Sequence, residues 1–361
     1  MPGRRGAPPY GRVVKRPVLL PLAGLLLIGA PACGSSPRPP SAATPPAAAS
    51  PVQSASPSPS PSPSTPPAPP PVDPLTGLPP APTSSVAIIK VDNGVLARPY
   101  QRGLERAAVV YQELVESGET RFAAVYSVAS PDEVGPVRSV RESDIELLRQ
   151  YGRVPVAFSG GNAGVKDSFH AAVRSGELLD ASYDVVPDDY RLGERRADAR
   201  NFFTTPAALT RSRPGSAARA VGLHFGPLPA GAGKPAATVR AIFSSYVSVT
   251  LQWQPSTRRW SITQDHRLMP LVAPANVIVQ QVPIRMSRYV DVLGSRTPYT
   301  VSTGSGPATV LRDGRALAAT WHRPGPGDGT RFVDAAGRDV PLRPGPTWIL
   351  LLPDGQPLTV G

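Results

Sequence analysis

Residues 109–116 read VVYQELVE and residues 121–128 read RFAAVYSV, with Gly118 between the two runs. Both runs are rich in β-branched and aromatic residues, and the glycine between them favours a turn, so they predict two neighbouring strands. Upstream, residues 86–91 read VAIIKV and predict a buried strand that ends at the turn formers of residues 92–94 (DNG). These three strands form the predicted centre of the N-terminal fold.

Helix and strand patterns alternate after these strands. Two serine–glutamate pairs within residues 139–146 have the spacing of a helix capping box, so we expect a helix that continues to about Tyr151. Residues 154–158 predict a further strand, which leads through the turn of residues 159–162 (SGGN) into a second helix that reaches Val173. This alternation is typical of an α/β or α+β domain.

The C-terminal part has a different pattern. After a glycine- and proline-rich break at residues 227–235, apolar and polar residues alternate over residues 247–253, which predicts a half-buried strand. Asp313–Gly314 lies between two further β-like runs and predicts a hairpin. We therefore expect an α/β or α+β domain over residues 73–221, followed by a mainly β domain over residues 222–361.

Residues 1–33 have the pattern of an export signal. Basic residues precede the apolar run VLLPLAGLLLIGA of residues 18–30, which is shorter than the roughly 20 residues needed to span a membrane. The run leads to Cys33, the single cysteine of the chain. The sequence APAC before and at Cys33 resembles a bacterial lipobox, although Ala30 stands where leucine is usual. The prediction is a signal peptide and a palmitate-type lipid on Cys33, with free secretion as the alternative.

Residues 34–72 are almost entirely proline, alanine, serine and threonine, and they include the repeat SPSPSPSPS at residues 56–64. Such a segment has too few large apolar groups to offset the entropy of ordering its chain. Proline also favours an extended conformation. We expect a disordered tether between the lipid and the folded part.

The net charge of +12 overstates the charge of the folded part. Six of the 38 basic residues lie within residues 1–72, which contain no acid, so 32 basic and 26 acidic residues remain. These are spread along the chain, whereas nucleic-acid binders more often gather basic residues into a patch with aromatics. No nucleic-acid partner is expected.

The residue types present argue against several kinds of site. One cysteine permits no intrachain disulfide, and the four histidines lack the paired spacing of a zinc site, so no metal and no cofactor is expected. Residues 157–161 (AFSGG) lack the first glycine of a serine-hydrolase elbow. Trp321 and Trp348 could stack on a sugar, but such residues more often belong to the core.

Arginines and a glycine-rich turn suggest an anion site, since guanidinium groups and free backbone N–H groups suit phosphate or carboxylate. The candidate anion-binding residues are Arg121, Arg138, Arg141, Ser159, Gly160, Gly161 and Asn162. The carboxylates nearby in sequence could act as acid or base, or could be structural: Asp92, Glu113, Glu116 and Asp144. In the alternative interpretation, Arg138 and Arg141 pair with Glu113, Glu116 or Asp144 and only hold loops in place.

Five segments resemble the YerB-like family of bacterial lipoproteins, a domain of unknown function with N-terminal and C-terminal parts. They are KVDN (90–93), ARP (97–99), VYQELVESGETRF (110–122), GPVRSVRESDI (135–145) and FSGGN (158–162). The chain departs from the family pattern at Ala108, where aspartate is usual, at Gln112, where an acid is usual, and at Ser117, where glycine is usual. The resemblance implies a fold and a lipid-anchored location, and it implies no known chemistry.

Two functional hypotheses remain. The first is a binding or scaffold module, anchored by lipid on the extracytoplasmic face of the cell membrane, whose partner is a cell-wall polymer or an envelope protein. The alternative is an enzyme that acts on envelope glycopolymers or their phosphate links. The tether, together with the lack of a nucleophile, metal set or cofactor motif, favours binding over catalysis.

Overall fold

The structure is a computed structural model, and it describes residues 71–80, 85–127, 131–291 and 294–361. The predicted signal peptide, Cys33 and the predicted tether up to residue 70 lie outside the described residues. Those predictions are therefore carried by the sequence alone.

The largest sheet has 11 strands in the order β18-β17-β16-β13-β19-β2-β3-β1-β4-β5, with β8 paired to β17. Its strands from the N-terminal part are β1 (Ala87–Asp92), β2 (Val109–Leu114), β3 (Thr120–Tyr126), β4 (Pro155–Ala157) and β5 (Leu179–Asp180). Those from the C-terminal part are β8 (Lys234–Pro235), β13 (Asn276–Val282), β16 (Gly304–Arg312), β17 (Arg315–Arg323), β18 (Arg331–Val333) and β19 (Thr347–Pro353).

The three strands expected at the centre of the N-terminal fold are present. β2 and β3 form an antiparallel hairpin, and β1 lies antiparallel on the other side of β3. β4 then pairs parallel with β1, and β5 pairs parallel with β4. Every residue of β1 and β3 is buried, which explains their nearly continuous apolar sequences.

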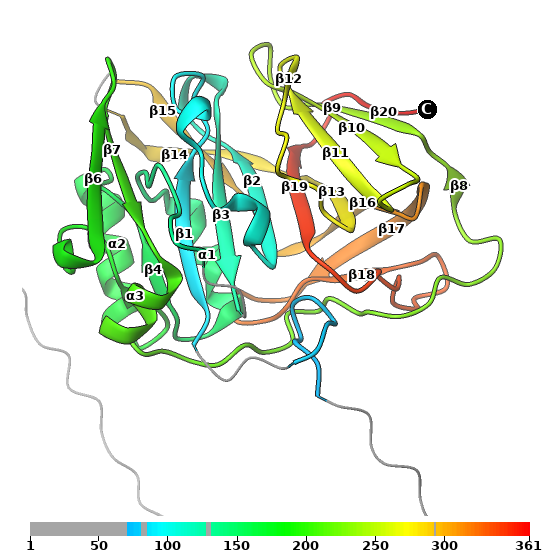
Figure 1. Ribbon diagram of the computed structural model, residues 1–361, viewed down its shortest axis with the longest axis horizontal. Helices are drawn as coiled ribbons and strands as arrows, with labels where there is room; N and C mark the ends of the chain where they lie inside the picture. The colour runs from blue at the N-terminus through cyan, green and yellow to red at the C-terminus, as the bar shows by residue number, and fades with distance from the viewer. Residues whose placement is uncertain (1–70, 81–84, 128–130, 292–293) are drawn as a thin grey trace, which may run out of the picture. The chain divides into compact units, whose positions relative to one another are not determined.

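Strands from both sides of residue 222 share this sheet. β19 pairs in parallel with β2, from Thr347 opposite Val109 to Leu350 opposite Gln112, and it also pairs in parallel with β13. Figure 1 shows β19, in red, next to the cyan β2. The last third of the chain therefore supplies a central strand that covers the edge of the N-terminal hairpin.

The remaining strands form smaller sheets. A five-stranded sheet has the order β12-β11-β10-β9-β20, with β9 (Thr238–Ile242), β10 (Ser248–Gln254), β11 (Arg259–Gln264), β12 (Arg267–Leu268) and β20 (Leu358–Val360). Two separate hairpins are β6 (Tyr190–Arg195) with β7 (Arg200–Thr204), and β14 (Ile284–Val290) with β15 (Arg296–Thr300). The fold is thus an N-terminal α/β region followed by a mostly β region, as the sequence predicts.

Three α-helices occur in the described part of the chain: α1 (Glu142–Leu148), α2 (Ala163–Arg174) and α3 (Pro206–Ser212). Short 3-10 helices are η1 (Arg98–Tyr100), η2 (Leu104–Arg106), η3 (Glu116–Gly118), η4 (Arg149–Tyr151) and η5 (Pro187–Asp189). None of the helices within the described residues has the length and apolarity that a membrane span requires.

The start of α1 differs from the predicted serine capping boxes. Its N-cap residue is Arg141, whose backbone N–H donates to Oδ2 of Asp144 at 2.7 Å. Asp144 occupies the third helical position, where a carboxylate can reach back to accept from the N-cap amide. A negative charge there also interacts favourably with the positive end of the helix dipole. The acid of the cap is therefore an aspartate that sequence spacing did not single out.

The Asp313–Gly314 hairpin is confirmed. These two residues join β16 and β17 with φ values of 49° and 68°. Positive φ at both central positions is the requirement of the hairpin turn that Asp-Gly favours.

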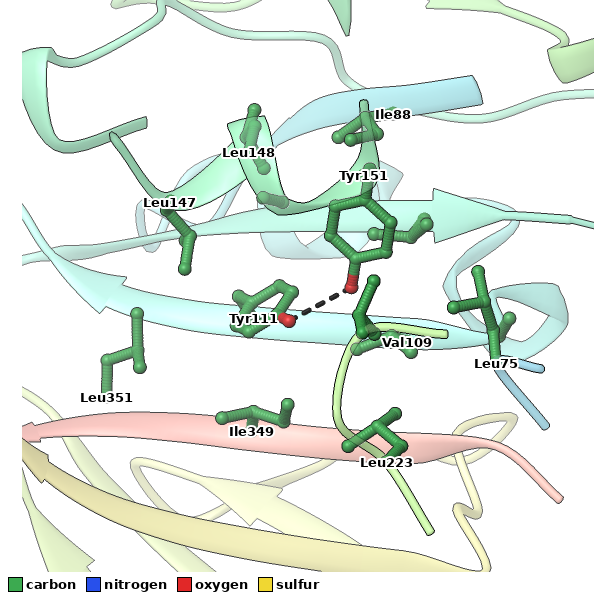
Figure 2. Packing of buried hydrophobic residues seen from close by; sticks show 14 of the residues in the cluster. Leu75, Ile88, Val109, Tyr111, Leu147, Leu148, Tyr151, Leu223, Ile349 and Leu351 are labelled. Atoms are coloured by element: carbon green, nitrogen blue, oxygen red, sulfur yellow. Dashed lines mark hydrogen bonds between the residues drawn. The ribbon is translucent and has the colours of Figure 1, made fainter. Parts of the chain in front are cut away.

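Two clusters of buried apolar side chains cover the two faces of the large sheet. In the first cluster, Tyr151 of η4 reaches down to Tyr111 of β2, and their hydroxyl groups lie 2.9 Å apart (Figure 2). Trp321 belongs to this cluster and Trp348 to the other, and both are buried, as the core interpretation predicts. The sheet is thus a rigid support for the charged residues at the ends of β1, β2 and β3.

Candidate functional site

One cross-strand row holds three of the candidate residues. Arg121 of β3 is the register partner of both Asp92 on β1 and Glu113 on β2. Side chains that lie directly opposite in an antiparallel pair are close neighbours, so the register itself gathers these charges. Nε of Arg121 lies 3.3 Å from Oδ1 of Asp92, and its Nη1 lies 3.0 Å from Oε2 of Glu119. Arg121 is therefore committed to ion pairs within the protein.

Asp92 is the centre of a group of three arginines, Arg121, Arg138 and Arg196, which we call the arginine cluster. Nη2 of Arg196 lies 2.7 Å from Oδ2 of Asp92, and Nε of Arg138 lies 3.5 Å from the same oxygen. The backbone N–H of Gly94 donates to Oδ1 at 3.0 Å. Burial would raise the pKa of Asp92, but Arg121 and the other donors outweigh it and lower the pKa, so the carboxylate stays ionised.

Arg196 was missed by sequence reasoning. Its Nε and Nη2 lie 2.9 and 3.1 Å from the oxygens of Asp198, and its Nη1 donates to Asn201 at 2.6 Å. It lies 104 residues after Asp92 in the chain, on the β6–β7 hairpin, within the charged run GERRADAR. Nothing in that run distinguishes this arginine from its neighbours.

Arg138 differs from the other two members of the arginine cluster. Its side chain is 29% exposed, compared with 9% for Arg121 and 3% for Arg196. Its guanidinium has only the 3.5 Å ion pair with Asp92 among the described residues. Burial, together with the like charges of Arg121 and Arg196, lowers its pKa below the usual arginine range despite the attraction of Asp92. The terminal nitrogens of Arg138 thus remain available to another acceptor.

Arg141 belongs to a separate pair. Its Nε and Nη2 donate to Oε2 of Glu116 at 2.9 and 2.7 Å. The other oxygen of Glu116 accepts a hydrogen bond from Thr297 at 2.6 Å. Burial would raise the pKa of Glu116, but Arg141 and Thr297 lower it. The structural pairing that the sequence left open is therefore present for Arg141 and Glu116.

The glycine-rich turn of residues 159–162 lies against the backbone of Arg138. The amide of Ser159 donates to the carbonyl of Arg138 at 3.1 Å, and its hydroxyl donates to that of Val137 at 2.7 Å. Asn162 is the N-cap of α2, where its Oδ1 accepts from the amide of Gly164 at 2.9 Å. The amides of Gly160 and Gly161 have no acceptor among the described residues. This turn can therefore still offer backbone donors.

Glu113 and Asp144 meet at a residue that was not a candidate, Lys90. Nζ of Lys90 lies 2.6 Å from Oε1 of Glu113 and 2.5 Å from Oδ1 of Asp144, and all three side chains are at most 1% exposed. Ser143 donates to the second oxygen of Glu113 at 2.8 Å. The sequence does carry a signal for this group, because a lysine inside the apolar strand VAIIKV requires a buried counter-ion.

The group of Lys90, Glu113 and Asp144, called the buried triad below, has two acids for one base. Burial would lower the pKa of Lys90, but the two carboxylates raise it. Burial would also raise the pKa of Glu113, but Lys90 lowers it. Burial and the charge of Glu113 raise the pKa of Asp144 to about 7, although Lys90 opposes them. Asp144 therefore keeps a proton up to about neutral pH, whereas Glu113 stays ionised beside Lys90.

The candidates therefore fall into three groups on adjoining elements. Asp92, Arg121 and Arg138 meet in the arginine cluster, Glu113 and Asp144 meet in the buried triad, and Glu116 pairs with Arg141. The turn of residues 159–162 adjoins Arg138 through its backbone. Among these candidates, Arg138 is the partly exposed and incompletely paired cation, and the other charges are paired within the protein.

Comparisons with known proteins agree on one family. Residues 75–219 match "Protein of unknown function (DUF3048) N-terminal domain", and residues 238–349 match the corresponding C-terminal domain. A protein of Bacillus subtilis (strain 168), named "Putative lipoprotein YerB", is 24% identical over 303 residues, which cover 78% of this chain and 86% of that protein.

A solved structure supports the same relationship at the level of the fold. The crystal structure of the YerB protein from Bacillus subtilis superimposes with a TM-score of 0.65 at 21% sequence identity, and the match covers 80% of this chain and 99% of that one. Because the N-terminal and C-terminal domain models both match this chain, and in that order, the chain belongs to the YerB-like family of proteins with DUF3048 N-terminal and C-terminal domains.

Proposed function

We propose that this protein is a lipid-anchored binding module that is displayed outside the cell membrane and holds an anionic envelope ligand. The name of the Bacillus subtilis relative supports the anchor, as does the leader of residues 18–30 before Cys33. The tether of residues 34–72 would separate the folded part from the lipid. The ligand is a phosphate- or carboxylate-bearing wall polymer, or an envelope protein that carries such groups.

The observation that carries this proposal is the state of Arg138. Its side chain is 29% exposed, and the ion pair that it makes within the described part of the chain, to Asp92, is long at 3.5 Å. The amides of Gly160 and Gly161, in the turn that adjoins the backbone of Arg138, have no acceptor among the described residues. Guanidinium groups and free backbone N–H groups both suit phosphate and carboxylate oxygens.

The enzyme alternative has one observation in its favour. The pKa of Asp144, about 7, suits a general acid or base at neutral pH. However, the buried triad is at most 1% exposed, and a catalytic acid must reach the proton that it transfers. The closed position of these carboxylates favours binding over catalysis.

The binding proposal is tested with Arg138→Ala in the mature protein. We expect co-sedimentation with purified cell-wall polymer to weaken by roughly tenfold, because one charge-assisted bidentate contact contributes about 1.4 kcal/mol or more. Arg174→Ala is the matched control, since Arg174 is an exposed arginine in the last turn of α2, away from its N-terminus. Equal retention of the parent protein and the Arg138 variant would refute the role of Arg138.

The anchor is tested separately with Cys33→Ala. The parent protein should fractionate with membranes and incorporate labelled palmitate, whereas the variant should do neither. Because Cys33 is the single cysteine, no other thiol can substitute for it. A parent protein that carries no label would leave free secretion as the route of export.

A further inference from the structure

A cleft of about 210 Å³ opens beside the end of β1, between the segment of residues 93–105 and that of residues 264–272. The first segment follows β1, and the second runs from the end of β11 through β12. The cleft contains no member of the arginine cluster or of the buried triad. It is therefore a second candidate site, independent of the proposed function.

One wall of the cleft carries a relay of amide side chains whose direction is fixed. Nε2 of Gln101 donates to the backbone carbonyl of Asp92 at 2.9 Å, and a carbonyl can only accept. The same Nε2 donates to Oδ1 of Asn93 at 3.1 Å, so Nδ2 of Asn93 is the atom that donates onward to Oε1 of Gln264 at 3.0 Å. Nε2 of Gln112 donates to that oxygen as well, at 3.2 Å.

The direction of these hydrogen bonds leaves one donor, on Gln264, without a partner. With Oε1 of Gln264 accepting from Asn93 and Gln112, the other end of its amide must be Nε2, and Nε2 has no acceptor among the described residues. Turning this amide over would place its N–H groups against Nδ2 of Asn93, a donor whose direction Gln101 fixes. Gln264 is 1% exposed and lines the cleft. A buried donor of this kind is unfavourable until an acceptor meets it.

The charges around the cleft favour an anionic acceptor. Three arginines and one glutamate line it: Arg98, Arg102, Arg267 and Glu105. Arg98 is held by Asp265 at 2.6 Å, and Arg102 donates to the carbonyls of Pro99 and Gln101. The exposed side chain of Arg267 has no partner among the described residues. At least one cation of the rim is thus free to approach a ligand.

The rest of the lining is apolar. Leu104 and Val272 are buried, while Leu268 and Leu271 are 53% and 72% exposed at the rim. Large aliphatic side chains that remain exposed beside a cleft favour an apolar group on the ligand. The volume lies below the roughly 300–1,000 Å³ of sites for drug-sized ligands, so the ligand group is small.

We propose that this cleft binds a small amphiphilic carboxylate, whose acid oxygen accepts from Nε2 of Gln264 and lies near Arg267, and whose short aliphatic part lies against Leu104 and Leu271. The relay from Gln101 through Asn93 orients the donor before the ligand arrives. The C-terminal β11–β12 segment and the N-terminal segment after β1 both contribute to the site, so ligand binding would also hold these segments together.

The test is a titration of the full mature protein with hexanoate, followed by NMR of backbone amides. We expect saturable shifts confined to residues 93–105 and 264–272. Hexanol, which lacks the charge, and acetate, which lacks the chain, should each bind about tenfold more weakly, a difference of about 1.4 kcal/mol. Hexylammonium should not bind, because the rim is cationic.

Two variants test the roles of Gln264 and Arg267 in ligand binding. Gln264→Glu keeps an acceptor for Asn93 and Gln112 but replaces the donor with a carboxylate, and it should abolish hexanoate binding. Arg267→Ala changes only an exposed side chain, should stay folded, and should weaken binding several-fold, whereas Arg240→Ala on β9 of the same sheet should not. Hexanoate binding that is equal in the parent protein and in Arg267→Ala, shifts that fall elsewhere, or equal binding of hexylammonium would each overturn the proposal.

Discussion

Nζ of Lys90 lies 2.5 Å from Oδ1 of Asp144, and both side chains are fully buried. The two residues are 54 positions apart, so this contact ties α1 to strand β1 of the large sheet. Asp144 also accepts from the amide of Arg141 at 2.7 Å, and one carboxyl group therefore caps α1 and contacts a buried lysine.

Removing the lysine should therefore destabilise the protein strongly. Lys90→Met leaves Glu113 and Asp144 buried without their cation, a change that typically costs about 3–5 kcal/mol. Urea unfolding of the parent protein and the variant measures this loss. Lys234→Met, at an exposed position on β8, serves as the control. A loss below about 1 kcal/mol, the size of a surface ion pair, would contradict the assigned role.

Replacing the two carboxylates of the buried triad with neutral amides should restore much of the stability that Lys90→Met loses. In Lys90→Met combined with Glu113→Gln and Asp144→Asn, no uncompensated charge remains in the core. Replacing all members of a buried ionic group is often close to neutral, whereas removing one member is not. We expect the triple variant to unfold at a higher urea concentration than Lys90→Met alone, and the reverse order would show that packing, rather than charge, dominates.

The raised pKa of Asp144 predicts how stability changes with pH. In the unfolded chain this carboxyl loses its proton near its ordinary value of 3.8, whereas burial and Glu113 keep the proton in the folded state up to about 7. Between these values the folded state binds more protons, so the free energy of unfolding falls as pH rises. Asp144→Asn cannot titrate and should give a flatter profile from about pH 4 to 7.

Two other carboxylates make the free energy of unfolding depend on pH in the opposite direction. Asp92 and Glu116 have lowered pKa values, since arginines outweigh the effect of burial. Their stabilisation is present above their ordinary pKa values near 4 and disappears as pH falls through the lowered values. The loss of stability at acidic pH should therefore still be seen in Asp144→Asn. A variant whose whole profile runs parallel to that of the parent protein would mean that Asp144 does not titrate near neutral pH.

The pair of buried tyrosines gives a further prediction. The hydroxyl groups of Tyr111 and Tyr151 lie 2.9 Å apart beneath η4 (Figure 2). Tyr151→Phe leaves the hydroxyl of Tyr111 without this partner, and we expect a loss of about 1–3 kcal/mol. The double variant with Tyr111→Phe should lose less than the sum of the two single losses. Thermal or urea unfolding of all four proteins measures the coupling, and strict additivity would exclude it.

Local signals in the sequence predicted local structure well. The strand that contains Lys90, the Asp313–Gly314 hairpin and the buried Trp348 follow, respectively, from a nearly continuous apolar run, turn chemistry and residue size. Lys90 itself could have been singled out, because a charge within an apolar strand needs a buried partner. The alternation of strand and helix patterns gave the fold class, and the family resemblance implied a fold and a location but no chemistry.

Long-range partners could not be predicted in the same way. The pairing of Thr347 with Val109 and the ion pair of Arg196 with Asp92 both join segments that are far apart in sequence. No spacing rule relates such residues, since the fold alone brings them together. Arg121 was proposed as a free cation for the same reason, because its sequence neighbours do not reveal that the register places Asp92 beside it.

The two arginines on the same oxygen of Asp92 should respond differently to substitution, and this difference decides whether Arg138 is available to a ligand. Arg196 lies 2.7 Å from that oxygen, so Arg196→Ala should cost about 1.5–3 kcal/mol as a buried charged hydrogen bond is lost. Arg138 lies 3.5 Å away, is partly exposed and is repelled by both neighbouring arginines, so Arg138→Ala should change stability by less than about 0.5 kcal/mol. Urea unfolding of both variants measures the contrast. If Arg138→Ala destabilised the protein as much as Arg196→Ala does, Arg138 would be a required partner of Asp92. Its guanidinium could then not turn to an envelope anion without weakening the fold.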